Sequence, residues 1–223
     1  MTLRHLAKRT LGAMGYDITA RRENPILELW DTDPAFNALY AEIQPRTAVQ
    51  KQRLFILYQL ARDLQTNIAE VGVFRGGTSM LFSRRSPKST IYSFDTFGTG
   101  MPDTNPDKDT MSGGEFAVDG EEVRAYLHTR PNIVTIPGIF PHTADPIRDK
   151  TFGLVYLDVD IYQSYKDCLA FFYPRMNTGG VIIADDYGFK TCPGAKEAWD
   201  EFFADNPECS VYLPTGQAFV VKR

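Results

Sequence analysis

From residue 67 onward, short apolar runs alternate with stretches in which apolar residues recur at helical spacing. The runs predict seven strands, at residues 68–73, 90–94, 133–136, 154–157, 181–184, 210–213 and 218–221. Predicted helices at 78–85, 121–128, 164–173 and 195–204 separate most of these strands. This alternation predicts right-handed crossovers and a mainly parallel sheet, so the fold class is α/β.

The two ends of the chain depart from this alternation. Only residues 214–217 separate the last two strands, which predicts an antiparallel hairpin at one edge of the sheet. Residues 1–65 carry apolar positions at helical spacing and predict a helical cover within the same domain. A length of 223 residues fits one α/β domain with such a preface.

One long irregular segment, residues 96–120, is rich in Gly, Asp, Pro and Thr. A loop of this length inside a compact domain is usually an active-site lid or disordered. Both interpretations remain open from the sequence.

Composition narrows the function classes. Hydrophobic residues make up 43% of the chain, which is typical of a globular protein. A net charge of -4 and a pI near 5.4 leave no general basic surface, so we expect a small-molecule partner and no nucleic acid. Three cysteines without a CxxC pair favour neither a disulfide framework nor a thiolate metal site, which predicts a reducing, cytoplasmic location.

The N-terminal residues 1–18 have the pattern of a short basic amphipathic helix, without an apolar run long enough for a signal peptide or a transmembrane segment. Docking on the domain, or on a second subunit of a homodimer, is the favoured interpretation. Contact with an anionic membrane is the alternative.

A glycine-rich turn follows the first strand. Ligands of open α/β sheets bind beyond the carboxyl ends of the strands, and Gly72, Gly76 and Gly77 would let a ligand approach the backbone closely. The spacing is not GxGxxG, and Glu70 near the turn would repel a phosphate. The same acid suits a cationic nucleoside such as S-adenosylmethionine, and Asp95 after the second strand is the candidate for its ribose hydroxyls. The alternative for the glycine-rich turn is a tight connection from strand to helix that binds no ligand. The alternative for Asp95 is an N-cap or turn aspartate.

Four acids follow two neighbouring strands. Asp158 and Asp160 close the fourth strand, and Asp185 and Asp186 close the fifth, so all four are expected at one edge of the sheet. Crowded carboxylates repel one another unless a cation or proton lies between them, and oxygen ligands suit Mg²⁺, Ca²⁺ or Mn²⁺. The alternative to a metal site is that the four acids act separately, as helix N-caps and as ion-pair partners. His142, after the third strand, is a candidate general base or substrate contact, although a surface position is as well supported.

Several segments together are typical of one family. They are Arg46-Thr47 with Arg53-Leu54, residues 70–77, residues 95–98 with Met101-Pro102, residues 138–140, residues 157–164, Tyr173-Pro174, residues 179–187, and residues 192–198 with Glu201-Phe202. Over residues 46–221 the chain resembles the macrocin O-methyltransferase family, the TylF, MycF and NovP group of S-adenosylmethionine-dependent methyltransferases. The resemblance implies a class I (Rossmann-like) methyltransferase domain at 66–223, dependence on Mg²⁺ or Mn²⁺, and direct methyl transfer to a hydroxyl, in this family that of a sugar.

The resemblance also implies roles for individual residues. Glu70, Gly72 and Asp95 would hold the cofactor, and Asp158, Asp185 and Asp186 the metal. Further cofactor contacts are expected in the same segments, from Phe74, Arg75, Gly76, Thr78, Ser79, Thr96, Gly138, Ile139 and Phe140. Asp158 or Asp160 would receive the proton, and Asp160 would either join the metal ligands or orient the substrate. Val159, where Gly is common, and His142, where an acid is frequent, depart from the family pattern, so the acceptor can differ.

Two other functions fit parts of the pattern. A metal-dependent hydrolase or phosphotransferase could use the four acids, but Glu70 and the lack of a Walker lysine argue against it. A non-catalytic nucleoside-binding scaffold would keep the fold, and the retained acids argue against that.

Overall fold

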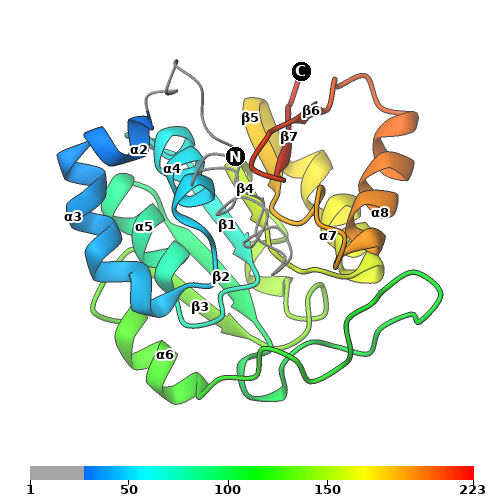
Figure 1. Ribbon diagram of the computed structural model, residues 1–223, viewed down its shortest axis with the longest axis horizontal. Helices are drawn as coiled ribbons and strands as arrows, with labels where there is room; N and C mark the ends of the chain where they lie inside the picture. The colour runs from blue at the N-terminus through cyan, green and yellow to red at the C-terminus, as the bar shows by residue number, and fades with distance from the viewer. Residues whose placement is uncertain (1–27) are drawn as a thin grey trace, which may run out of the picture.

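The computed structural model describes residues 28–223, whose centre is one twisted sheet (Figure 1). Its seven strands are β1 (Asn67–Val71), β2 (Ile91–Asp95), β3 (Ile133–Pro137), β4 (Phe152–Leu157), β5 (Met176–Ala184), β6 (Val211–Tyr212) and β7 (Ala218–Val221). Their order is β3-β2-β1-β4-β5-β7-β6. The first five strands are parallel, and β7 runs antiparallel to both β5 and β6. The predicted mainly parallel sheet with a C-terminal edge hairpin is confirmed.

Helices cover both faces of this sheet. The crossover helices are α5 (Gly77–Arg85), α6 (Gly120–Leu127), α7 (Tyr162–Phe172) and α8 (Pro193–Ala204), and the N-terminal ones are α2 (Leu29–Thr32), α3 (Pro34–Ile43) and α4 (Lys51–Leu60). Figure 1 shows α3, α4 and α5 on one side of the sheet and α7 and α8 on the other. The side chain of Asp33 caps α3 by accepting a hydrogen bond from the backbone N–H of Phe36 at 2.9 Å.

The core lies in two layers, because successive side chains of a strand point to opposite faces. On β1, Ile68 packs into the layer under α4 and α5, whereas Ala69 and Val71 pack into the layer under α7 and α8. All three are buried, as expected for a central parallel strand that is covered on both sides. Glu70, two residues after Ile68, therefore points to the same face of the sheet, toward α5.

The long segment after β2 is packed against the start of two helices. Asp109 is 8% exposed, and its Oδ1 accepts a hydrogen bond from the backbone N–H of Tyr162 at 2.9 Å. The hydroxyl of Thr110 donates to the carbonyl oxygen of Thr191 at 2.6 Å. These contacts hold the segment across the carboxyl edge of the sheet, near the first turns of α7 and α8.

Two sequence predictions are not tested by these elements. The amphipathic helix expected at residues 1–18 lies outside residues 28–223, and the division of the chain between residues 65 and 66 stays a prediction. Across the part of the chain that the structure describes, none of the helices is both long and apolar enough to cross a bilayer.

Candidate functional site

A cavity of about 290 Å³ opens at the carboxyl edge of the sheet. It lies beyond β1, β2, β4 and β5, and β1 and β4 are the neighbours at which the strand order reverses. Its wall also includes residues 47–49 and the segment after β2, with Met101, Met111 and Phe116. The ring of Phe116 meets that of Phe74 edge-on at 6.1 Å, so this segment contacts the glycine-rich turn.

The predicted cofactor residues fall into two groups. Those that line the cavity are Gly72, Phe74, Thr78, Asp95, Thr96, Gly138 and Phe140. Those that do not are Glu70, Arg75, Gly76, Ser79 and Ile139. Arg75 and Ile139 are exposed, whereas the other three of this second group are buried behind the turn.

The glycines of the turn are explained by packing of the protein on itself. A Cβ on Gly72 would lie 1.9 Å from the carbonyl oxygen of Asp158, and one on Gly77 would lie 2.8 Å from the carbonyl oxygen of Arg46. Gly76 is similarly restricted by the side chain of Leu127, at 2.9 Å. The close approach of β4, α6 and the 3-10 turn at Gln44–Arg46 therefore accounts for these glycines by itself, and their contact with a ligand stays a prediction.

Asp95 joins the turn to the end of β2. Its Oδ2 accepts hydrogen bonds from the backbone N–H groups of Val73 (2.7 Å) and Phe74 (2.9 Å), and its Oδ1 accepts one from Phe97 (2.5 Å). A carboxylate has about four acceptor positions, so these three bonds leave about one for a ribose hydroxyl. Contact with both ribose hydroxyls would require shared hydrogen bonds.

Glu70 is fully buried on the α5 face of the sheet, beneath the turn. The hydroxyl of Ser79 donates to its Oε2, while its Oε1 has no hydrogen-bond partner. Burial, together with the charge of Asp95, raises the pKa of Glu70 to about 8. The carboxyl group of Glu70 therefore holds a proton at neutral pH in the ligand-free protein. The cavity is lined by the next residue on β1, Val71, and not by Glu70.

This protonation predicts a pH dependence of stability. The folded-state pKa of about 8 lies above the ordinary value of 4.5, so the folded state binds the extra proton. The free energy of unfolding should consequently fall as pH rises from about 4.5 to about 8, by a few kcal/mol from this group. We expect Glu70→Gln to flatten that slope in urea titrations at several pH values. An exposed control, Glu121→Gln, should keep the wild-type slope, and an unchanged slope in Glu70→Gln would contradict the assignment.

The predicted acid cluster is formed. One carboxylate oxygen from each of Asp158, Asp185 and Asp186 lies within 4.8 Å of the others. Burial, and then the charges of neighbouring acids, raises the pKa of Asp158 well above its ordinary value, and burial raises that of Asp186. Crowded carboxylate oxygens whose mutual repulsion a cation would relieve are suited to Mg²⁺ or Mn²⁺. The residues present therefore fit the metal that the sequence predicts.

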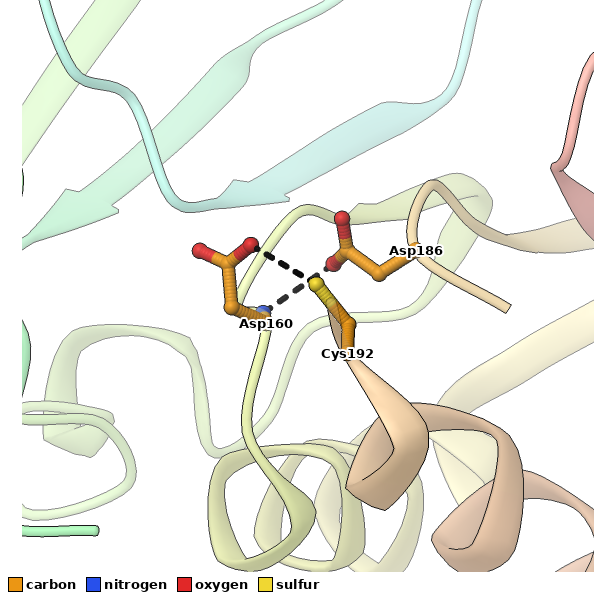
Figure 2. A group of neighbouring side chains, drawn as sticks. All are labelled: Asp160, Asp186 and Cys192. Carbon is orange, nitrogen blue, oxygen red and sulfur yellow. Dashed lines mark hydrogen bonds between the residues drawn. The ribbon is translucent and has the colours of Figure 1, made fainter. Parts of the chain in front are cut away.

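Asp160 is held by two neighbours (Figure 2). Its backbone N–H donates to Oδ2 of Asp186 at 3.0 Å, and the thiol of Cys192 donates to its Oδ1 at 3.4 Å. Burial, followed by the charge of Asp186, raises the pKa of Asp160 to about 7. Burial and the same acids also raise the pKa of the Cys192 thiol, so Cys192 acts as a hydrogen-bond donor. A carboxyl group with a pKa near neutral pH is well suited to proton exchange.

His142 is not brought to the cavity. Its side chain is exposed, and it is not among the residues of the cavity wall. The structure thus agrees with the surface interpretation and gives no support to a general base at this position.

Sequence reasoning missed two direct partners of Asp185. Arg53, on α4, forms an ion pair with Asp185, and the side-chain amide of Gln217 donates to Oδ1 of Asp185 at 2.8 Å. Arg53 is part of a segment that carries the family resemblance, but no role follows from that. Gln217 lies in the hairpin connection, and nothing in the pattern marks it.

Comparison with known proteins gives consistent matches. A model of the macrocin O-methyltransferase (TylF) family matches residues 45–207. Demethyldecarbamoylnovobiocin O-methyltransferase of Streptomyces niveus is 30% identical over 182 residues, covering 71% of this chain and 68% of that protein. The 8-demethyl-8-(2,3-dimethoxy-alpha-L-rhamnosyl)-tetracenomycin-C 4'-O-methyltransferase of Streptomyces olivaceus is 29% identical over 153 residues, which cover 61% of this chain and 58% of that enzyme. The solved structure of the O-methyltransferase NovP superimposes with a TM-score of 0.69 at 27% identity, covering 79% of this chain and 82% of NovP.

Proposed function

The chain belongs to the macrocin O-methyltransferase family and is an S-adenosylmethionine-dependent O-methyltransferase with a class I fold, and from this premise we propose its acceptor and its metal dependence. The acceptor is a hydroxyl of a sugar or of a sugar-containing small molecule. The transfer depends on Mg²⁺ or Mn²⁺ held by Asp158, Asp185 and Asp186. The observation that carries the proposal is the convergence of these three carboxylates in the same cavity as Asp95 and the glycine-rich turn.

The chemistry follows from the residues of this cavity. Bound S-adenosylmethionine supplies an electrophilic methyl group, and a bound divalent cation lowers the pKa of a hydroxyl group beside it. Asp160, with a pKa of about 7, receives the proton of the acceptor hydroxyl, and Asp158 is the alternative. The segment with Met101, Met111 and Phe116 excludes water from the reacting atoms. The remaining cofactor contacts are proposed for the residues of the cavity wall.

The nature of the acceptor is supported by the relatives and by the cavity wall. The names of the matched enzymes describe O-methylation of novobiocin and tetracenomycin precursors, and one of these names includes a rhamnosyl group. The cavity wall combines acidic side chains with apolar ones such as Met111 and Phe116, which suits an acceptor with both hydroxyl groups and an apolar part. We also propose a cytoplasmic location, because all three cysteines are free thiols. A homodimer stays a prediction.

Methyl transfer to a panel of acceptors tests this function. Purified protein should transfer label from S-adenosylmethionine to glycosylated small molecules in the presence of Mg²⁺, and less to simple phenols. Chelation of the metal should reduce transfer to background, because the acceptor hydroxyl then keeps a high pKa. Calorimetry should still detect binding of S-adenosylmethionine to the metal-free protein. Transfer that resists chelation would refute the metal dependence alone, whereas turnover of a phosphorylated substrate without methyl transfer would favour the hydrolase alternative.

A further inference from the structure

The acid cluster already contains a cation that belongs to the protein. The Nη1 atom of Arg53 forms an ion pair with Oδ2 of Asp185. The side chain of Arg53 is 11% exposed and that of Asp185 is fully buried, so water screens this pair weakly. The guanidinium group also lies over the ring of Phe189, 4.7 Å from its centroid.

The pairing occupies one of the predicted metal ligands. Oδ1 of Asp185 accepts from Gln217 and Oδ2 accepts from Arg53, so both oxygens of this carboxylate have protein partners. A divalent ion that used Asp185 would stand beside a guanidinium group, and the two positive charges would repel each other strongly in a buried site. Metal and Arg53 therefore compete for the same carboxylate.

The guanidinium group of Arg53 lacks one of its hydrogen bonds in this position. Its Nε atom is buried and has no hydrogen-bond partner. A guanidinium group has five N–H donors, and a buried N–H group without an acceptor costs free energy in the folded state. The position of Arg53 beside Asp185 thus depends on the ion pair and not on a full set of hydrogen bonds.

We propose that Arg53 is a positioning residue that neutralises the acid cluster in the metal-free enzyme and sets its affinity for divalent metal by competing for Asp185. The inference rests on the proposed metal dependence of the enzyme. Metal binding is then an exchange, in which the guanidinium group leaves Oδ2 of Asp185 as the ion enters. The role concerns affinity and the position of Asp185, and it requires no contact between Arg53 and the reacting atoms.

Calorimetry with Mn²⁺ and with Mg²⁺ on the full-length protein tests this role. Arg53→Met removes the competing charge, so its metal affinity should rise roughly ten- to hundredfold over wild type, as is typical for coupled sites. Arg53→Lys keeps the charge and should remain near the wild-type affinity. The matched control is Lys51→Met, on the same helix, which removes an equal charge from an exposed pair with Asp31 and should leave the affinity unchanged.

Stability provides a second readout that does not depend on activity. Metal-free Arg53→Met should melt below wild type, because a buried carboxylate has lost its cation, and saturating Mn²⁺ should raise its melting temperature more than it raises that of wild type. If Arg53→Met does not fold, Arg53→Gln, which keeps a hydrogen-bond donor, replaces it. An unchanged or weaker metal affinity in the neutral variants would overturn the inference while leaving the proposed function intact. Absence of metal binding in every variant, wild type included, would overturn both the inference and the metal dependence.

Discussion

Asp158→Asn is expected to lower kcat/KM for methyl transfer roughly a thousandfold or more while the affinity for S-adenosylmethionine changes little. The substitution removes one of the three carboxylates proposed to hold the metal. It leaves Asp95 and the glycine-rich turn unchanged, and these lie at the ends of other strands. Steady-state kinetics with a confirmed acceptor, together with calorimetry for the methyl donor, measure the two quantities separately.

The variant should fold normally, which makes the result interpretable. The hydroxyl of Tyr156 donates to Oδ2 of Asp158 at 3.1 Å, and an asparagine oxygen can accept the same hydrogen bond. The pKa of Asp158 is raised because burial and the neighbouring acids disfavour its charge, and the neutral asparagine introduces no such unfavourable charge into the metal-free protein. The melting temperature without metal should therefore stay the same or rise.

A surface substitution provides the control for this prediction. Asp145→Asn also removes one carboxylate, but from an exposed pair with Arg148, and should keep kcat/KM within about twofold of wild type. A loss of S-adenosylmethionine affinity in Asp158→Asn as large as the loss of activity would mean that the metal ligands and the cofactor site are not separate. Retained activity would remove Asp158 from the metal site.

The fold was predictable because it depends on periodicity and on connection length. Runs of buried residues mark the central strands, and the four residues between the last two strands leave room only for a hairpin. The convergence of Asp158 with Asp185 follows from the same information, because parallel neighbouring strands end at the same edge of the sheet. Residue type and topology were sufficient there.

The cofactor side was less predictable because it depends on which way each side chain points. Glu70 follows Ala69 on β1 and so faces α5 and Ser79, although sequence distance from the turn suggests a ligand contact. Gly72 fits a ligand-binding turn equally well in sequence, yet the backbone of β4 occupies the space beside it. Arg53 reaches Asp185 from 132 positions away through the packing of α4, which no local pattern encodes.

Gly72→Ala is expected to destabilise the protein by about 3 kcal/mol or more, the sum of backbone strain and overpacking. The residue has a φ of +92°, which disfavours any side chain. Its Cβ would also lie 1.9 Å from the carbonyl oxygen of Asp158, a backbone atom that cannot rotate away. The change in the free energy of unfolding is measured by urea denaturation, with the m-value as a check on two-state behaviour.

Gly179→Ala separates the two causes. Gly179 has a φ of +79°, but a Cβ there would meet no atom within 4 Å, so this variant carries the strain without the clash and should lose only about 1 kcal/mol. The excess loss in Gly72→Ala then measures the contact between the turn and the end of β4. Because relief of that clash must change the position of the backbone of Asp158, a proposed metal ligand, any Gly72→Ala protein that remains folded should also bind Mn²⁺ more weakly. Equal stability losses in the two variants would show that the turn and β4 are not in contact, and the link between the cofactor turn and the acid cluster would then be lost.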